Sequence, residues 1–294
     1  MLDKGLMAQI KSLEIKARHL ASQSLTGEYA SVFKGFGIEF DEIREYAMGD
    51  DVRNIDWNVT AKMNQPYIKV FREEREMTLF LLIDVSFSQH FGSFAKTKRD
   101  IAAELAAILA LLASNNNDKI GLIMFSDRVE KVVPPLKARG HVWQILRNIL
   151  THETKHTGTN IAAAVDAFSK LQKRKSVCFV ISDFLMPDYE KPLKTMAARH
   201  DVIAATIVDP HEASLPGAGY VRFQDLETGE THVVDASDPV IASSIQRKHE
   251  DHAHKLGVFF NRTRIDHVRI DTTESVIKGL VSLIRKRDRR SAGA

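Results

Sequence analysis

Residues 78–88, with the sequence TLFLLIDVSFS, constrain the fold of this chain more than any other stretch. An apolar run rich in Leu, Phe and Ile ends in a carboxylate, Asp84, which is followed by hydroxyls at Ser86 and Ser88. The run is too short for a comfortable helix and shows no alternation of polar and apolar residues, so it predicts a buried strand covered on both faces. Polar side chains at the carboxyl end of such a strand lie where open α/β sheets bind ligands.

From residue 78 onward, segments typical of strands alternate with segments typical of helices. Further strands are predicted at 119–125, 129–133, 176–182, 202–208 and 267–271. Helices are predicted at 99–113, 141–150, 161–171, 191–199, 239–256 and 274–285. The alternation predicts an α/β fold with a doubly wound, mostly parallel sheet. Glycines bracket two short strands at 220–223 and 231–234, which indicates an inserted β-hairpin.

The first 77 residues have a different pattern. An amphipathic helix is predicted over 6–20, and the short strand-like pieces that follow lie at 37–40, 58–61 and 67–71. Between Glu39 and Asp56, seven acids and two arginines give a local charge of about −5. This stretch is either a face that binds a partner or an internal ion-pair network that joins the N-terminal region to the sheet through Arg44, Arg53, Arg72 and Arg75. Trp57 is expected in the core.

These patterns divide the chain into five parts. The parts are an N-terminal helix and β-rich accessory region (1–77), a core (78–210), an inserted hairpin packing with the accessory region (211–235), the completion of the core (236–288), and a basic disordered tail (289–294).

Composition and charge exclude several classes of protein. The chain has 294 residues, of which 44% are hydrophobic, and a net charge of +3. Residues 285–290 carry +4 of this charge, so the remainder is near −1 and does not suit a surface that coats nucleic acid. No window approaches the about 20 apolar residues that a membrane span needs. One cysteine, Cys178, and the lack of a signal-peptide core near Met1 predict a cytoplasmic protein.

Two later loops carry polar side chains at the same kind of position as Asp84. Thr159 precedes the predicted helix 161–171, and Asp183 follows the predicted strand 176–182. Since parallel strands bring their carboxyl ends to one edge, we expect a set of side chains to meet there: Asp84, Ser86, Ser88, Thr159 and Asp183. Oxygen ligands of this kind predict a Mg²⁺ site, with Mn²⁺ or Ca²⁺ as alternatives. Because the direct ligands are mostly neutral, a carboxylate from another protein is the natural sixth ligand.

The three loops, DVSFS, GTN and SD, resemble the metal-ion-dependent adhesion site of von Willebrand factor A domains. The resemblance implies a von Willebrand A-like core in which Ser86, Ser88 and Thr159 bind the metal directly, while the two carboxylates act directly or through water. Asn160 stands where the family frequently has Asp. The change removes a negative charge beside the site, which bears on metal affinity rather than on the existence of the site.

The stretch before the central strand carries a second resemblance. Residues 35–84, from GFGIEFDEIREYAMGDD to TLFLLID, are similar to the lead-in of a bacterial "domain of unknown function" family. The resemblance runs from about Gly35 to the C-terminal helix. It implies a non-catalytic adaptor that works with a MoxR-type AAA+ ATPase in protein remodelling or complex maturation. A client protein of unknown identity would supply the acidic residue that completes the metal site.

A magnesium-dependent phosphohydrolase is the alternative, because its sheet also places an Asp at the end of the first strand. That chemistry generally uses a second carboxylate two residues later as general acid and base, where this chain has Ser86. It also uses a lysine near a later helix start, and no motif surrounds the available Lys191. No Gly-rich loop ending in Gly-Lys-Ser/Thr occurs, so the chain is not itself an ATPase. We therefore predict no catalytic residues.

Overall fold

The chain divides by its internal contacts into two units, one formed by residues 1–33 with 78–294 and the other by residues 34–77. The computed structural model describes residues 11, 12, 15, 27, 29, 32, 33, 37–74, 77–137, 139–154, 158–214, 219–224 and 231–292. The helix predicted over 6–20 lies almost wholly outside the described residues. Phe33, which we predicted to be part of an accessory region, instead packs its ring 6.1 Å from that of Phe179 in the sheet of the larger unit.

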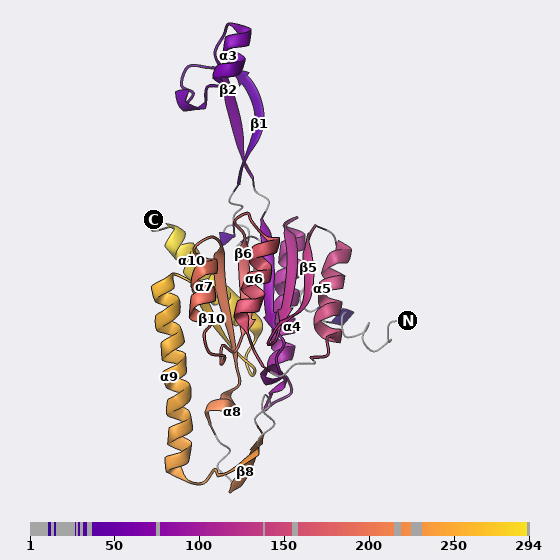
Figure 1. Ribbon diagram of the computed structural model, residues 1–294, viewed down its shortest axis with the longest axis vertical. Helices are drawn as coiled ribbons and strands as arrows, with labels where there is room; N and C mark the ends of the chain where they lie inside the picture. Colours follow the sequence, from indigo (N-terminus) through magenta and orange to yellow (C-terminus); the bar gives the residue numbers. More distant parts are fainter. Residues whose placement is uncertain are drawn as a thin grey trace. The chain divides into compact units, whose positions relative to one another are not determined.

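The larger unit is built on a sheet with β3 near its centre (Figure 1). In the described part of the chain, this sheet has six strands in the order β10-β7-β6-β3-β4-β5. Their bounds are β3 (Thr78–Asp84), β4 (Lys119–Phe125), β5 (Val129–Leu136), β6 (Val177–Ser182), β7 (Asp201–Val208) and β10 (Asp266–Asp271). Neighbouring strands are parallel except for β5, which pairs antiparallel with β4 at one edge. The predicted doubly wound, mostly parallel sheet is confirmed.

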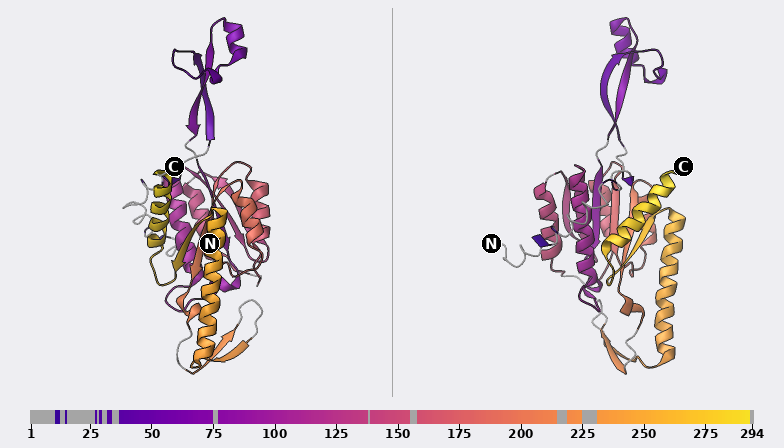
Figure 2. Two further views of the ribbon diagram at one scale, coloured as in Figure 1. Left: turned by 90° about the vertical axis from the view of Figure 1, so that its left-hand side faces the viewer. Right: turned by 180° about the vertical axis from the view of Figure 1, so that it is seen from behind.

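Helices cover both faces of this sheet, which explains why its four inner strands, β3, β4, β6 and β7, are nearly continuous apolar runs (Figure 2). One face carries α4 (Lys98–Asn115), α5 (Arg139–Thr151) and α10 (Val276–Ala292), and the other carries α6 (Ile161–Leu171), α7 (Glu190–Ala197) and α9 (Pro239–Thr263). On the second face, aromatic rings form much of the core, with Phe80 and Phe168 packed edge to face at 5.0 Å. The first turn of α4 is fixed by a capping box between Thr97 and Asp100.

The order of strands creates a topological switch point at the centre of the sheet, where open α/β sheets are expected to have a crevice. The chain winds outward from β3 through β4 to β5, and then returns to β6 on the other side of β3. Connections therefore leave β3 and β6 in opposite directions, and open α/β sheets bind ligands at such a point. Asp84 ends β3 and Asp183 follows β6 directly, so the fold brings two predicted metal ligands to this switch point.

The last two helices are longer than the sequence pattern predicted. We expected a helix over 239–256 and another over 274–285 followed by a disordered tail, but α9 continues to Thr263 and α10 to Ala292. The prediction of a disordered tail is wrong for residues 289–292, which are helical. Arg290 donates a hydrogen bond of 2.6 Å to Asp266 at the start of β10, so the basic end of the chain is attached to the sheet. The predicted insertion contains α8 (Pro210–Ala213) and a hairpin of β8 (Tyr220–Gln224) with β9 (Thr231–Asp235), and its packing with the accessory region stays a prediction.

In the smaller unit, β1 (Gly37–Glu45) pairs antiparallel with β2 (Tyr67–Glu74). Between them lie a 3-10 turn, η2 (Val52–Asn54), and a short helix, α3 (Trp57–Met63). The Asp56 carboxylate accepts the backbone N–H groups of Asn58 and Val59 and thereby starts α3. The strand predicted at 58–61 is therefore wrong, since these residues form the helix that Asp56 caps.

Side chains of the smaller unit bear on two expectations about its surface. Two local ion pairs lie within the unit, because Arg44 is 2.7 Å from Asp50 and Arg53 is 2.7 Å from Asp51. A network that joins this region to the sheet stays a prediction, as does the alternative of a partner-binding face. Trp57 is 70% exposed, so its predicted place in the core is wrong.

Gly121 on β4 is required by the packing of Phe80. The two residues face each other across the β3–β4 ladder, and a Cβ added at Gly121 would lie 2.5 Å from the Phe80 ring. We expect Gly121→Ala to lower the free energy of unfolding by about 2 kcal/mol, because the buried ring cannot move without overpacking its neighbours. Gly140→Ala in α5, where an added Cβ meets nothing within 4 Å, is the matched control and should not destabilise the protein. Denaturant unfolding of the two variants measures the difference.

Candidate metal-binding edge of the sheet

Asp84 is a buried carboxylate held by neutral hydrogen-bond donors. Its Oδ1 accepts the backbone N–H of Ser86 at 2.9 Å, and its Oδ2 accepts the Ser182 hydroxyl at 2.6 Å. Burial, together with the nearby charge of Asp183, raises the pKa of Asp84 from 3.8 to about 7, against the opposing effect of these hydrogen bonds. In the part of the chain that the structure describes, no cation pairs directly with Asp84, whereas Asp183 has Lys98 as its partner.

The two serines of the first loop place their hydroxyls side by side. After β3 the chain forms a 3-10 turn, η3 (Phe87–His90), and the Oγ atoms of Ser86 and Ser88 lie 3.0 Å apart. Ser86 is fully buried and Ser88 is partly buried. The side chain of Gln89 is buried beside them, and its Oε1 has no hydrogen-bond partner among the described residues. The first loop therefore presents a cluster of oxygens with unused acceptor capacity.

The second predicted loop lies at the end of the neighbouring strand β4. The backbone N–H of Asn160 donates to the carbonyl of Ser126, which follows β4, at 2.6 Å. The Asn160 side chain caps α6 by accepting the N–H of Ala162 at 3.0 Å. Thr159 is partly buried on the same loop, at the same edge of the sheet as Asp84. Residues 155–157 of the loop lie outside the described residues.

The third loop holds Asp183 and turns sharply after it. Phe184 has a φ of +55°, a left-handed conformation that costs a bulky residue roughly 1–2 kcal/mol. The conformation is held in place because the Phe184 ring is buried against Phe260 at 5.5 Å, and because the Phe184 N–H donates to Ser182. The turn leaves the next side chain, Leu185, 49% exposed beside the site.

A buried lysine that the sequence did not point to completes this edge. Lys98, the first residue of α4, has a fully buried side chain whose Nζ lies 2.7 Å from Asp183 and 2.5 Å from Glu212 of α8. Burial lowers the pKa of Lys98, but the two carboxylates outweigh this and raise it overall. Nothing in the sequence separates Lys98 from its neighbours Lys96 and Arg99, so only the fold identifies it. Ser182, which donates to Asp84, belongs to the SD loop that the sequence did indicate, but it was not among the predicted site residues.

Asp209 follows β7 at the same edge of the sheet, and its hydrogen bonds join three loops there. Its carboxylate accepts the hydroxyl and N–H of Ser93, the N–H of His211 at 2.9 Å, and the hydroxyl of Thr272 at 2.8 Å. Burial raises the pKa of Asp209, but these hydrogen bonds lower it overall. The loop that precedes α4 is thereby tied to the start of the inserted segment.

The predicted residues fit a hard divalent cation. Asp84, Ser86, Ser88 and Asp183 are brought to one edge of the sheet by the contacts above, and Thr159 lies on the adjoining loop. Every one of these side chains offers oxygen, which is what Mg²⁺, Mn²⁺ and Ca²⁺ prefer. Asp183 is already paired with Lys98, which suits a carboxylate that acts through water more than one that binds directly. Their role as metal ligands stays a prediction.

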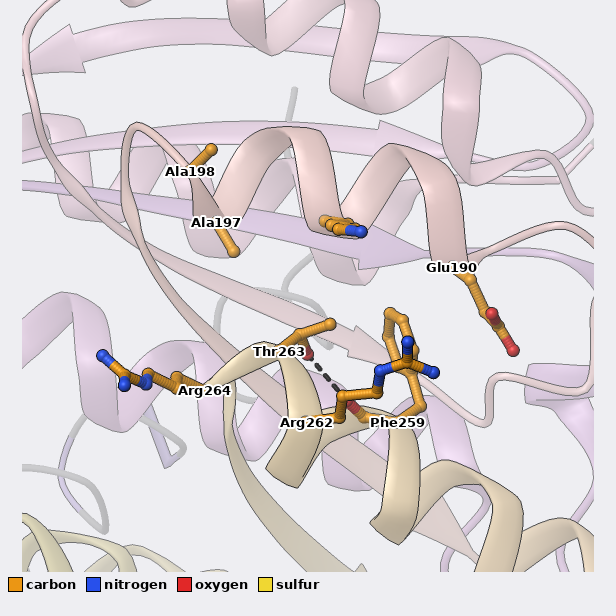
Figure 3. Close-up of a pocket in the computed structure, with 8 residues that line it drawn as sticks. Glu190, Ala197, Ala198, Phe259, Arg262, Thr263 and Arg264 are labelled. Atoms are coloured by element: carbon orange, nitrogen blue, oxygen red, sulfur yellow. Dashed lines mark hydrogen bonds between the residues drawn. The ribbon is translucent and has the colours of Figure 1, made fainter.

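A pocket elsewhere in the larger unit is a weaker candidate for a functional site. It lies between α7 and α9, and its lining consists of Glu190, Lys194, Ala197, Ala198, Phe259, Arg262, Thr263 and Arg264 (Figure 3). The charged side chains among these are exposed, and none of the predicted metal ligands lines it. Cys178, in β6, is fully buried, and burial raises the pKa of its thiol, as expected for an unreactive core residue.

The larger unit is an α/β domain with a doubly wound, mostly parallel sheet, one antiparallel edge strand and a layer of helices on each face. The sequence matches the family described as "Protein of unknown function DUF58" over residues 42–255, and this protein belongs to that family. The uncharacterized protein Rv1480 of Mycobacterium tuberculosis is 34% identical over 230 residues, which cover 77% of this chain and 73% of that protein. The uncharacterized protein Mb1516 of Mycobacterium bovis matches to the same extent.

Solved structures with a similar fold are more distant in sequence. The conserved hypothetical protein BatB from Bacteroides thetaiotaomicron is 16% identical with a TM-score of 0.48, covering 72% of this chain and 99% of that chain. An aerotolerance-related membrane protein from Bacteroides fragilis is 17% identical with a TM-score of 0.47, covering 71% and 99%. The VWA domain of SpRpn10 is 14% identical with a TM-score of 0.42, covering 70% and 94%.

The prediction of a cytoplasmic location is corrected by these comparisons. The solved structures that match include the membrane protein from Bacteroides fragilis and, at 12% identity with a TM-score of 0.28, a protein from Vibrio fischeri described as membrane spanning. Among the described residues, no helix is both long and apolar enough to cross a bilayer. The composition of the chain was therefore not a sound basis for assigning a compartment.

Proposed function

We propose that this protein is a non-catalytic binding module whose metal-binding edge recognises an acidic side chain of a partner protein. The observation that carries the proposal is the buried Asp84 beside the paired hydroxyls of Ser86 and Ser88, at the switch point where α/β sheets bind ligands. Thr159 and Asp183 would complete the set. A bound Mg²⁺ would supply the positive charge that a partner's carboxylate needs, and the chain's own residues would orient it.

The proposed partners are a MoxR-type AAA+ ATPase and a client protein. The resemblance of residues 35–84 to the family lead-in, which implies work with such an ATPase, is the ground for proposing the first partner. The smaller unit offers a surface for protein binding, because four large apolar side chains are more than half exposed in it: Met48, Val52, Trp57 and Met63. Exposed aromatic and Met side chains are typical anchors of protein interfaces.

The phosphohydrolase remains the second candidate because Lys98 lies at the site where such chemistry needs a cation. Two features weigh against it. The Lys98 side chain is fully buried and already donates to Asp183 and Glu212, and position 86 carries a hydroxyl where a general acid is needed. An assay with small phosphate esters and Mg²⁺ tests the candidate, and we expect no turnover.

Affinity capture tests the binding function. The purified chain is immobilised, and lysate of its native cells is passed over it in Mg²⁺ and again in EDTA, with the retained proteins identified by mass spectrometry. We expect an AAA+ ATPase, a client protein or both to be retained in Mg²⁺ only, and to be lost with Asp84→Asn. The exposed Asp166→Asn variant, on α6, is the control and should behave as wild type. Retention that ignores both EDTA and Asp84→Asn would contradict a metal-dependent contact.

A further inference from the structure

We propose that the buried ion triad Asp183–Lys98–Glu212 sets how tightly the metal-binding edge holds a divalent cation. In this triad the Lys98 ammonium weakens cation binding and the Glu212 carboxylate strengthens it. The inference rests on the metal site proposed above and extends it to two residues outside the predicted ligand set. It assigns a function to the one fully buried lysine that the described residues contain.

The triad is a fixed arrangement of charges. Lys98 Nζ lies 2.7 Å from Asp183 Oδ2 and 2.5 Å from Glu212 Oε1, and its side chain is 0% exposed. The side chain of Asp183 is 4% exposed and that of Glu212 is 15% exposed. The ammonium therefore cannot turn to solvent without leaving two largely buried carboxylates unpaired, which is strongly unfavourable.

The position of Glu212 is fixed independently of Lys98. Its Oε2 accepts the backbone N–H of Asp209 at 3.2 Å, as part of the capping box that starts α8. Asp209 is held in turn by Ser93 and Thr272. Glu212 thus belongs to the segment that leads to the β8–β9 hairpin, while Asp183 belongs to the metal-binding edge. Lys98 joins these two segments by forming an ion pair with each of them.

By their charges, Lys98 and Glu212 should have opposite effects on the affinity of the site for a cation. A cation bound near Asp183 is repelled by Lys98, and the repulsion is weakly screened because the surroundings are buried. Glu212 balances part of that positive charge. Removing the ammonium leaves uncompensated negative charge for the cation, whereas removing the Glu212 charge leaves Lys98 to neutralise Asp183 alone.

Magnesium binding to the full chain tests the inference. Mg²⁺ is titrated into the purified protein in a calorimeter, and the rise in melting temperature on adding Mg²⁺ is measured in parallel. We expect Lys98→Met to lower the Kd for Mg²⁺ by about tenfold and Glu212→Gln to raise it by about tenfold. Lys98→Met should also show a larger Mg²⁺-induced rise in melting temperature than wild type, because the cation replaces the lost charge.

Lys96→Met is the matched control. Lys96 also lies near the start of α4 and pairs with a mostly buried carboxylate, Glu104, at 2.6 Å, but it does not contact Asp183. Its replacement should leave the Kd unchanged. Should Lys98→Met fail to fold, Glu212→Gln still decides, because it keeps the size of the side chain and removes only the charge.

The outcomes separate this inference from the proposed function. Wild type that binds Mg²⁺, with Lys98→Met and Glu212→Gln unchanged or shifted in the same direction, overturns the triad and leaves the metal site intact. Absence of Mg²⁺ binding in wild type and in both variants overturns the metal site and the triad together. A lower Kd in Lys98→Met and a higher Kd in Glu212→Gln, with Lys96→Met unchanged, support both, whereas shifts of the reverse sign overturn the triad.

Discussion

Asp84→Asn is expected to make the metal-free protein more stable at pH 8 than wild type and to abolish its stabilisation by Mg²⁺. The substitution keeps the shape of the side chain and an oxygen that accepts the N–H of Ser86. It removes the buried negative charge, which is the unfavourable part of the site when no cation is present. Thermal denaturation at several pH values, with and without Mg²⁺, measures both effects.

The pH dependence follows from the direction of the pKa shift. The pKa of Asp84 is raised in the folded protein to about 7, from the ordinary 3.8 that applies to the unfolded chain. Below pH 3.8 the group is protonated in both states and costs nothing. As the pH rises from there to about 7, the unfolded chain releases its proton first, so wild type loses stability relative to Asp84→Asn. Above pH 7 the difference reaches its full size, on the order of 4 kcal/mol.

Magnesium should reverse this order for wild type only. A bound cation stabilises the folded state in proportion to its affinity, and it requires the ionised carboxylate. The Mg²⁺-induced rise in melting temperature should therefore be larger at pH 8 than at pH 5.5 in wild type, and absent in Asp84→Asn. Asp166→Asn, an exposed acid of α6, should reproduce wild type under all conditions.

Two results would contradict this account. A variant less stable than wild type at pH 8 without metal would show that the Asp84 carboxylate serves mainly as a hydrogen-bond acceptor for Ser86 and Ser182. An undiminished response of the variant to Mg²⁺ would place cation binding elsewhere in the chain.

The sheet of the larger unit could be predicted from sequence because its signal is local and strong. Strands buried on both faces are continuous apolar runs, and 78–84 and 119–125 each end in a change to polar or turn residues. The positions of Asp84 and Asp183 then followed from the rule that parallel strands end at one edge. Their adjacency needed no knowledge of side-chain packing.

The charges that surround those residues could not be predicted in the same way. Lys98 and Glu212 are 114 residues apart, and they meet only because α8 packs beside the start of α4. Neither residue stands in a recognisable motif. The hydrogen bond from Ser182 to Asp84 spans 98 residues and depends on the register of β3 against β6. Long-range polar contacts of this kind are properties of the fold rather than of a sequence window.

Errors in the prediction have identifiable physical causes. Residues 58–61 alternate weakly, which indicated a strand, but the Asp56 cap outweighs that pattern and starts a helix. The basic stretch 285–290 looked like a solvated tail because charge runs usually are. Acids at the amino ends of two strands, far away in sequence, give it partners instead.

Arg287→Met is accordingly expected to destabilise the protein by about 3 kcal/mol, although its position was predicted to lie just before a disordered tail. The Arg287 guanidinium pairs with Asp201 at the start of β7 and lies 3.5 Å from Asp266 at the start of β10. It also stacks over the Phe33 ring at 4.8 Å. The substitution leaves two mostly buried carboxylates without this partner, which is the costly way to break an ion pair.

Denaturant unfolding of Arg287→Met and of Arg289→Met tests whether stability depends on the net charge of α10 or on the ion pairs of Arg287, because each variant removes one positive charge. Arg289 is exposed on the same helix, so its replacement should change the free energy of unfolding by less than about 0.5 kcal/mol. Adding Asp201→Asn to Arg287→Met should restore part of the lost stability, because Asp201 then no longer lacks a cation, whereas Asp266 keeps its pair with Arg290 at 2.6 Å. Equal, small effects of the two arginine substitutions would mean that this end of α10 is attached too weakly to stabilise the sheet. A large effect of Arg287→Met alone, relieved by Asp201→Asn, would establish that α10 holds the amino end of β7 through this ion pair.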